Sequence, residues 1–316
     1  MNFRINRSWP ALTLFALMLV FTSAARAATI YAINSTSSLL TFDSATPGAL
    51  LSNVGITGVG AGESLLGIDF RPANGSLYAL SADAGNIGRL YTINTTTGAA
   101  TLASTLSTPL GGANGFGMDF NPVPDRLRIV NSSGQNLRVN VDTGAVTTDT
   151  NLAYAVGDSK FGINPSVSAA AYSNNFAGSV VTTLYDLDIE LKLLAIQTPP
   201  NGGVLNTVGA LGVTPNSIER AGLDILTDSG GTNTAFAMLS TQTSPNGFYT
   251  INLATGAATF VGDIGAVLRS PIQDIAAAPL PPGGGGPGTP LPPALLLAIP
   301  GAAFAAIRAR RWNRGK

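Results

Sequence analysis

The chain has 316 residues, only 11% of them charged, and a formal net charge of 0. It contains no cysteine and no histidine, which excludes disulfides, Ser-His-Asp catalysis and histidine metal sites. Between residues 28 and 279 nine basic residues stand against 17 acidic ones. The resulting charge of −8 disfavours nucleic acid and anionic lipid as partners of this part of the chain.

The first 27 residues have the organisation of a signal peptide. Arg4 and Arg7 give a basic start, and the apolar run 11–21 is too short for an ordinary membrane span. Residues 25–27, Ala-Arg-Ala, then form a small-x-small cleavage site. We expect export with cleavage after Ala27; an uncleaved anchor is the alternative.

Residues 28–279 contain an internal repeat of about fifty residues. The segment GIDFRPANGSLYAL (67–80) is echoed by GMDFNPVPDRLRIV (117–130). A degenerate copy has Ala171 at the aspartate position, and successive copies are 50, 52, 53 and 50 residues apart. The sequence therefore predicts five copies of four short strands each, with the recurrent aspartate on the innermost strand. These aspartates are Asp69, Asp119, Asp224 and Asp274.

A second repeated unit predicts the outer hairpin of each copy. An asparagine stands four residues before a glycine in LYTINTTTGAAT (90–101), LRVNVDTGAVT (137–147) and FYTINLATGAAT (248–259). Asparagine caps such a turn with its side chain, and glycine takes the positive φ that other residues resist. We interpret these residues as structural.

The two ends of the repeat region predict a closed ring. The chain after residue 28 starts with TIYAIN (29–34) and lacks a first strand, which appears at the far end as IQDIAAAP (272–279). One blade assembled from both ends closes a ring, so we predict an all-β, five-bladed β-propeller. A β-sandwich, or a pair of them, is the rival interpretation.

These segments, taken together and in order, resemble the bacterial secreted family known as domain of unknown function 4394. The resemblance runs over residues 29–279 and includes AAAYSNN (169–175) and TTLYDLD (182–188). It implies a propeller-like secreted domain and no particular activity.

Three arginines fall within thirteen positions, on strands two and three of one copy. Alternation places Arg126 and Arg128 on one face of the blade, and we expect Arg138 to join them across the hairpin. One interpretation is a salt-bridge network between blades, with Asp119, Asp125 and Asp142 as partners. The other is a pocket for an anion or a sugar acid, in which Asn121 and Asn136 assist the three arginines.

The carboxylates suggest three further sites, none of which implies a cofactor. The recurrent aspartates surround the predicted central channel, where they would bind a cation or serve a glycosidase, which needs carboxylates but no histidine. Four equivalent copies instead favour a structural role, such as accepting hydrogen bonds from amides of the next turn. Glu63 and Glu219 are non-repeated carboxylates near the channel mouth. Asp186, Asp188 and Glu190 alternate along one strand and offer oxygens to Ca²⁺.

Three segments follow the repeat region. Residues 280–290 form a Pro/Gly linker, residues 291–307 are apolar, and residues 308–316 carry a basic cluster. The sequence TPLPPALLLAIPGAAFAAIRARRW (289–312) resembles PEP-CTERM sorting signals, which an exosortase recognises, although it lacks Pro-Glu-Pro. The resemblance implies transient anchoring in the inner membrane and processing; a permanent tail anchor is the alternative.

The sequence as a whole predicts an exported binding or structural module. The resemblance of its tail to exosortase signals implies the cell surface of a polysaccharide-producing Gram-negative bacterium as its location. Its expected partner is extracellular polysaccharide. A glycoside hydrolase that uses channel-facing carboxylates is the alternative function.

Overall fold

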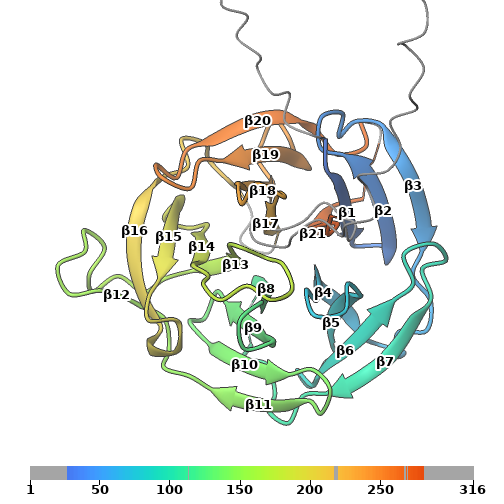
Figure 1. Ribbon diagram of the computed structural model, residues 1–316, viewed down its shortest axis with the longest axis horizontal. Coiled ribbons are helices and arrows are strands. Elements are labelled where there is room, and N and C mark those ends of the chain that lie inside the picture. The colour runs from blue at the N-terminus through green and yellow to red at the C-terminus, as the bar shows by residue number, and fades with distance from the viewer. Residues whose placement is uncertain (1–26, 113, 217–219, 267, 269, 281–316) are drawn as a thin grey trace, which may run out of the picture.

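The computed structural model describes residues 27–280 except 113, 217–219, 267 and 269, and in these residues it shows five small antiparallel sheets arranged in a ring (Figure 1). Each sheet is one blade, and its strands run in sequence order from the axis to the rim. The predicted five-bladed β-propeller is therefore confirmed. The exceptions to the simple order are blade 1, which is built from both ends of the repeat region, and blade 4, which gains a short fifth strand.

The strands of each blade are named here from the axis outwards. Blade 1 contains β21 (Ile272–Ala277), β1 (Thr29–Asn34), β2 (Ser38–Asp43) and β3 (Leu50–Gly55). Blade 2 contains β4 (Ser64–Phe70), β5 (Leu77–Ala82), β6 (Gly88–Ile93) and β7 (Ala100–Thr105). Blade 3 contains β8 (Phe116–Asn121), β9 (Arg126–Asn131), β10 (Asn136–Asn140) and β11 (Ala145–Thr148). Blade 4 contains β13 (Val167–Tyr172), β14 (Leu184–Asp188), β15 (Leu193–Gln197) and β16 (Val204–Ala210), with β12 (Ala153–Tyr154) at its rim. Blade 5 contains β17 (Ala221–Thr227), β18 (Asn233–Leu239), β19 (Gly247–Ile251) and β20 (Ala258–Asp263).

The ring closes through the pairing that the sequence predicts. β1 runs antiparallel to β21, with Ile30 opposite Ala277 and Ile33 opposite Asp274. The closing strand ends at Ala277, two residues before the predicted end at residue 279. Without β21 the inner edge of β1 would be unpaired, so the two ends of the domain hold each other in place.

The hydrophobic core lies between the blades. Each of the five buried apolar clusters combines side chains from two adjacent blades. The inner and middle strands are consequently buried on both faces, whereas the residues of outer strands such as β3 and β11 are exposed or half-buried. Apolar residues on both faces are what a strand needs when sheets cover both of its sides.

The outer hairpins have the expected turn chemistry. The Oδ1 atom of Asn252 accepts the Ala254 amide at 2.9 Å, and Gly256 has φ of 79°. The equivalent Gly144 has φ of 73°, and a Cβ there would strike the carbonyl oxygen of Thr105 in blade 2. The turns therefore demand glycine for conformation and also for close contact with the preceding blade.

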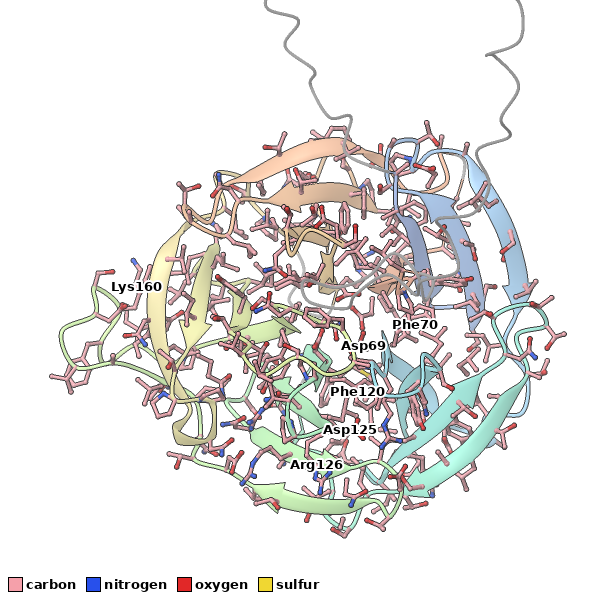
Figure 2. The ribbon with its side chains drawn as sticks, in the orientation of Figure 1. Asp69, Phe70, Phe120, Asp125, Arg126 and Lys160 are labelled. Carbon is pink, nitrogen blue, oxygen red and sulfur yellow. The ribbon has the colours of Figure 1, made fainter. Side chains whose placement is uncertain are left out.

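Two features of blade 4 depart from the simple repeat. β12 runs parallel to β16, and the loop between β12 and β13, which carries Lys160, projects from the ring (Figures 1 and 2). A 3-10 helix, η1 (Pro200–Gly202), interrupts the connection from β15 to β16. Among the described residues no helix is long and apolar enough to cross a membrane.

Several predictions concern residues outside the described part of the chain. These are the signal peptide up to residue 26, Glu219, and everything from residue 281, including most of the linker, the apolar segment 291–307 and the basic segment 308–316.

Candidate functional site

The hairpin of β9 and β10 places the three arginines on the side of blade 3 that faces blade 4. Arg128 lies opposite Arg138 in the register, and Arg126 lies opposite Asn121 of β8. The alternate residues Leu127 and Ile129 face the other way, into the core shared with blade 2. Period-two alternation therefore produces both the core face and the arginine face.

Arg128 is the buried centre of the group, with 1% of its surface exposed. Its guanidinium donates to Asp149 Oδ2 at 2.7 Å and to Asn136 Oδ1 at 2.7 Å within blade 3. It also donates to Asn201 Oδ1 at 2.8 Å and to the Tyr172 hydroxyl at 3.3 Å in blade 4. Arg128 thus joins the two blades while its charge is balanced inside its own blade.

Arg138 shares the same carboxylate. Its Nε and Nη2 atoms donate to the two oxygens of Asp149 at 2.7 and 2.9 Å. Burial alone would raise the pKa of Asp149, but the hydrogen bonds from Arg138 and Arg128 outweigh burial and hold that pKa below its ordinary value. One ionised carboxylate therefore serves two guanidinium groups, and the positive charge is in excess.

Arg126 is the first residue of β9, the second strand of blade 3 from the axis, and is half-buried (Figure 2). Its Nη1 atom donates to two backbone carbonyl oxygens, of Asp125 at 2.8 Å and of Pro124 at 3.3 Å. Among the described ion pairs none involves Arg126. Its guanidinium is held by backbone carbonyls, and after Arg71 it also contributes to lowering the pKa of the nearby Asp142.

The carboxylates that we expected to pair with these arginines do not do so. Asp125 and Asp142 bind Arg71, which follows β4 of blade 2, at 2.6 and 2.7 Å. The expected ion pairs between blades exist, but they link blades 2 and 3 through a different arginine. Asp119 faces Arg128 in the register, yet neither of its oxygens makes a hydrogen bond.

The true partner, Asp149, was missed because it lies just beyond β11, outside the repeated motif. Its own amide donates to the Asn136 carbonyl oxygen at 2.9 Å, which fixes it beside the arginine hairpin. Its signal in the sequence is weak, because an acidic residue at the end of strand four also occurs in blade 5, where Asp263 ends β20.

The arginines surround a cavity of about 260 Å³ between blades 3 and 4, called here the arginine pocket. The loop after β8 and the helix η1 of blade 4 complete its wall. Asn136 is not part of the lining; its amide donates to the carbonyl oxygens of Thr150 and Pro200 at 3.0 Å and holds η1 against Arg128. The lining residues are Asn121, Pro124, Arg126, Arg128, Arg138, Tyr172, Pro200 and Asn201.

The four recurrent aspartates lie on the innermost strands, as predicted, and Asp69 is labelled near the centre of Figure 2. Each innermost strand is paired on one side only, so its other edge presents unpaired amides to the axis. Three of the four aspartates accept hydrogen bonds from these amides across the blade boundary. The bonds run from Phe120 to Asp69 at 2.7 Å, from Ile68 to Asp274 at 2.9 Å, and from Ala277 to Asp224 at 2.6 Å.

The glycine of the G-x-D motif makes room for this contact. A Cβ at Gly67 would lie 2.9 Å from Asp274 Oδ2, and one at Gly222 would lie 2.6 Å from Asp274 Oδ1. At Gly117 it would lie 2.6 Å from the backbone nitrogen of Ala170 in blade 4. The glycine of the repeated motif therefore allows neighbouring inner strands to pack closely against each other.

The axial carboxylates are buried together. Burial raises the pKa of Asp69, Asp119, Asp224 and Asp274, and that of Asp224 reaches about 6. Nearby carboxylates add to the rise for Asp69 and Asp119, while backbone amides oppose it. A glycosidase needs two carboxylates on either side of an accessible sugar bond, whereas these are at most 5% exposed.

The other predicted carboxylates do not form a common site. Glu63 accepts from the Ser81 hydroxyl at 2.6 Å and pairs with Arg89 at 3.1 Å. Asp188 accepts from the Tyr154 hydroxyl at 2.8 Å, whereas Asp186 lies fully buried without a hydrogen bond. Glu190 is exposed in the turn after β14. In the described chain the acidic group with metal-ligand spacing is Asp69, Asp119 and Asp224.

Comparisons with known proteins identify a family. Residues 38–276 match the family described as Domain of unknown function (DUF4394). No match was found among curated proteins. Among solved structures, one titled "Crystal structure of Nidogen/Laminin Complex" is 8% identical, with a TM-score of 0.45 over 80% of this chain and 98% of that chain. A structural genomics protein of unknown function from Bacteroides thetaiotaomicron VPI-5482 is 15% identical, with a TM-score of 0.44 over 81% and 68% of the two chains.

Proposed function

Because the chain belongs to the DUF4394 family, whose description assigns no function, we propose a function from the site itself: a binding module that holds an acidic sugar or a similar small carboxylate in the arginine pocket. The observation that carries this proposal is the excess of guanidinium groups around one cavity. Arg128 and Arg138 share Asp149, and Arg126 makes no ion pair among the described residues.

The chemistry of the pocket suits a carboxylate. Guanidinium groups offer paired N–H donors that match the two oxygens of a carboxylate, and hydrogen bonds between charged groups are roughly twice as strong as neutral ones. The side chain of Arg138 is 34% exposed, whereas that of Arg128 is 1% exposed. Arg126 and Arg138 are therefore the donors that can reach a ligand, and Arg128 keeps the floor of the pocket rigid.

The size of the pocket limits the ligand. A cavity of about 260 Å³ is just below the range of roughly 300–1,000 Å³ that is usual for small-molecule sites. One sugar ring at the end of a chain fits this scale better than an internal segment of a polymer. The lining includes the amide groups of Asn121 and Asn201, which are suitable contacts for sugar hydroxyls, whereas Tyr172 is fully buried behind Arg128.

Binding is better supported than hydrolysis. Asp69, Asp224 and Asp274 accept amides of the neighbouring blades, and Glu63 is bonded to Ser81 and Arg89. Neither group is arranged about an open space that would hold a sugar bond, whereas the arginine pocket is open to solvent at Arg126.

We also propose that the module works outside the cytoplasm, at the cell surface of a bacterium that makes acidic polysaccharide. The support is in the sequence: a signal-peptide pattern at 1–27 and a tail at 289–312 that resembles an exosortase signal. The net charge of −8 between residues 28 and 279 makes a local positive pocket selective, because the rest of the surface repels polyanions that it does not recognise.

The test is a binding screen of the purified protein against uronic-acid glycans and their neutral counterparts, with a hydrolysis assay on the same sugars. We expect acidic glycans alone to bind, without cleavage. Arg126→Gln and Arg138→Gln should each weaken binding about tenfold or more, the effect of losing a charged hydrogen bond. Lys160→Gln, which removes a charge from the projecting loop, should bind like the wild type. Equal affinity in all variants, binding of neutral glycans alone, or sugar hydrolysis would contradict the proposal.

A further inference from the structure

A second site lies on the axis of the ring, away from the arginine pocket. One carboxylate oxygen from each of Asp69, Asp119 and Asp224 lies within 4.8 Å of the other two. These side chains come from blades 2, 3 and 5, so residues that are far apart in the sequence converge at one point. They are 1%, 1% and 2% exposed.

Two of these aspartates accept backbone amides in hydrogen bonds of normal geometry, and the third does not. Asp69 accepts the amides of Phe70 and Phe120, and Asp224 accepts those of Ile225 and Ala277. Asp119 is buried to the same extent, and the Tyr172 amide lies near enough to oppose the rise of its pKa, but neither of its oxygens makes a hydrogen bond of normal geometry. A buried carboxylate that lacks a good hydrogen bond is costly, and a bound cation would offset that cost.

The ion pairs described for the chain do not involve these three aspartates. In the described part of the chain the ion pairs of Arg71, Arg89, Arg128 and Arg138 involve other carboxylates. In blade 4 Ala171 replaces the recurrent aspartate, so the repeat places no polar side chain at this position of the axis. The axis therefore gathers carboxyl groups from three blades, and the ion pairs described for the chain involve none of them.

The spacing fits a calcium-sized ion. Calcium binds carboxylate and carbonyl oxygens at about 2.3–2.6 Å, so two ligand oxygens of one ion are at most about 5 Å apart. Three oxygens within 4.8 Å of one another satisfy this condition. Because calcium takes six to eight oxygen ligands in flexible geometries, water and backbone carbonyls at the inner strand edges would complete its shell.

A hollow borders the innermost strands at one end. This hollow of about 450 Å³ is lined by Leu65, Phe116 and Gln273, which lie at the starts of the innermost strands. These residues precede Asp69, Asp119 and Asp274 by one to four positions. Asn114 and Arg220 also line the hollow.

We propose that Asp69, Asp119 and Asp224 form a divalent-cation site on the propeller axis, with Ca²⁺ as the fitting ion, and that the ion binds three blades together. Because the ligands come from blades 2, 3 and 5, loss of the ion would loosen the ring as a whole. The site has no part in the binding of the acidic sugar proposed above, since it lies on a different element of each blade and has the opposite charge.

The experiment is a calorimetric titration of EDTA-treated, desalted protein with CaCl₂, and with MgCl₂ in parallel, followed by melting at several calcium concentrations. We expect one Ca²⁺ per chain, weaker binding of Mg²⁺, and a melting temperature that rises with calcium concentration. Asp119→Asn should weaken calcium binding at least about 100-fold, because ligand charge sets affinity in such sites. Asp228→Asn, in an exposed turn, should bind like the wild type.

Two outcomes would overturn the proposal: no calcium binding by the wild type at millimolar concentration, or equal binding by Asp119→Asn and the wild type. If Asp119→Asn does not fold, Asp224→Asn replaces it. If neither variant folds, anomalous scattering from calcium-soaked wild-type crystals decides, since a peak between the three aspartates supports the site and a peak only elsewhere rejects it.

Discussion

Replacing Arg128 with methionine tests whether this arginine is the structural centre of the pocket. The change removes four hydrogen bonds and leaves the oxygens of Asn136 and Asn201 without that donor. Breaking a buried ion pair typically costs about 3–5 kcal/mol. Asp149 keeps both bonds from Arg138, so we expect a value near the lower end, about 3 kcal/mol.

For a domain of this size about 1 kcal/mol corresponds to roughly 2–4 °C in melting temperature. Arg128→Met should therefore melt about 6–12 °C below the wild type in a calorimetric scan at neutral pH. Arg126→Met is the matched control, because Arg126 bonds backbone carbonyls, and it should melt within about 2 °C of the wild type, as surface changes usually do. If Arg128→Met melts with the control, the assignment of Arg128 as a buried anchor is wrong.

Three further predictions concern the ring and its buried groups. Burial raises the pKa of Asp186 to about 8 in the folded protein. Between roughly pH 5 and 8 the folded protein therefore keeps a proton that the unfolded chain has lost, so the free energy of unfolding should fall by up to about 1.4 kcal/mol per pH unit. Asp186→Asn should remove that part of the slope in urea melts, and an unchanged slope would contradict the assignment. Gly117→Ala should destabilise the protein by about 1–3 kcal/mol or more, because its Cβ would lie 2.6 Å from the Ala170 backbone. The control Gly112→Ala, whose Cβ would meet nothing within 4 Å, should leave stability unchanged. Equal melting temperatures of the two variants would refute the close-packing argument. Ending the chain before residue 270 removes β21 and should give an insoluble or much less stable domain, whereas ending it after Leu280 should not; identical melting would refute closure through β21.

The fold was predictable because the same sequence pattern occurs in several copies. Each G-x-D copy predicts the same inner strand, each Asn/Gly pair predicts the same turn, and the copy split between the two ends predicts a closed ring. Agreement among several copies compensates for the weak signal of any single short strand. The strand β12 and the helix η1 were not predicted, since both lie in the least regular copy, where no repeat supports them.

The site was only partly predictable, for a related reason. Arg126, Arg128 and Arg138 stood out because they break the repeat, and period-two alternation was enough to put them on one face. Their surroundings depend on which blade lies next to that face and on insertions outside the motif. Asp149 follows strand four, and Asn201 lies in η1 of the next blade, so neither was visible as a partner. Pairing of Asp125 and Asp142 with Arg71 likewise follows from contact between blades and not from distance along the sequence.

The most direct test of the central claim is to observe the arginine side chains while a ligand binds. Guanidinium Nε–H signals can be followed by NMR during titration with D-glucuronate, with D-glucose as the neutral control and Arg126→Gln and Arg138→Gln to assign the signals. We predict saturable shifts of the Arg126 and Arg138 signals with glucuronate alone, and a weaker response in 0.5 M salt, at about which concentration charges on exposed groups are strongly screened. Unchanged Arg126 and Arg138 signals at saturating glucuronate, or equal shifts with glucose, would show that the arginine pocket is not an anion-binding site.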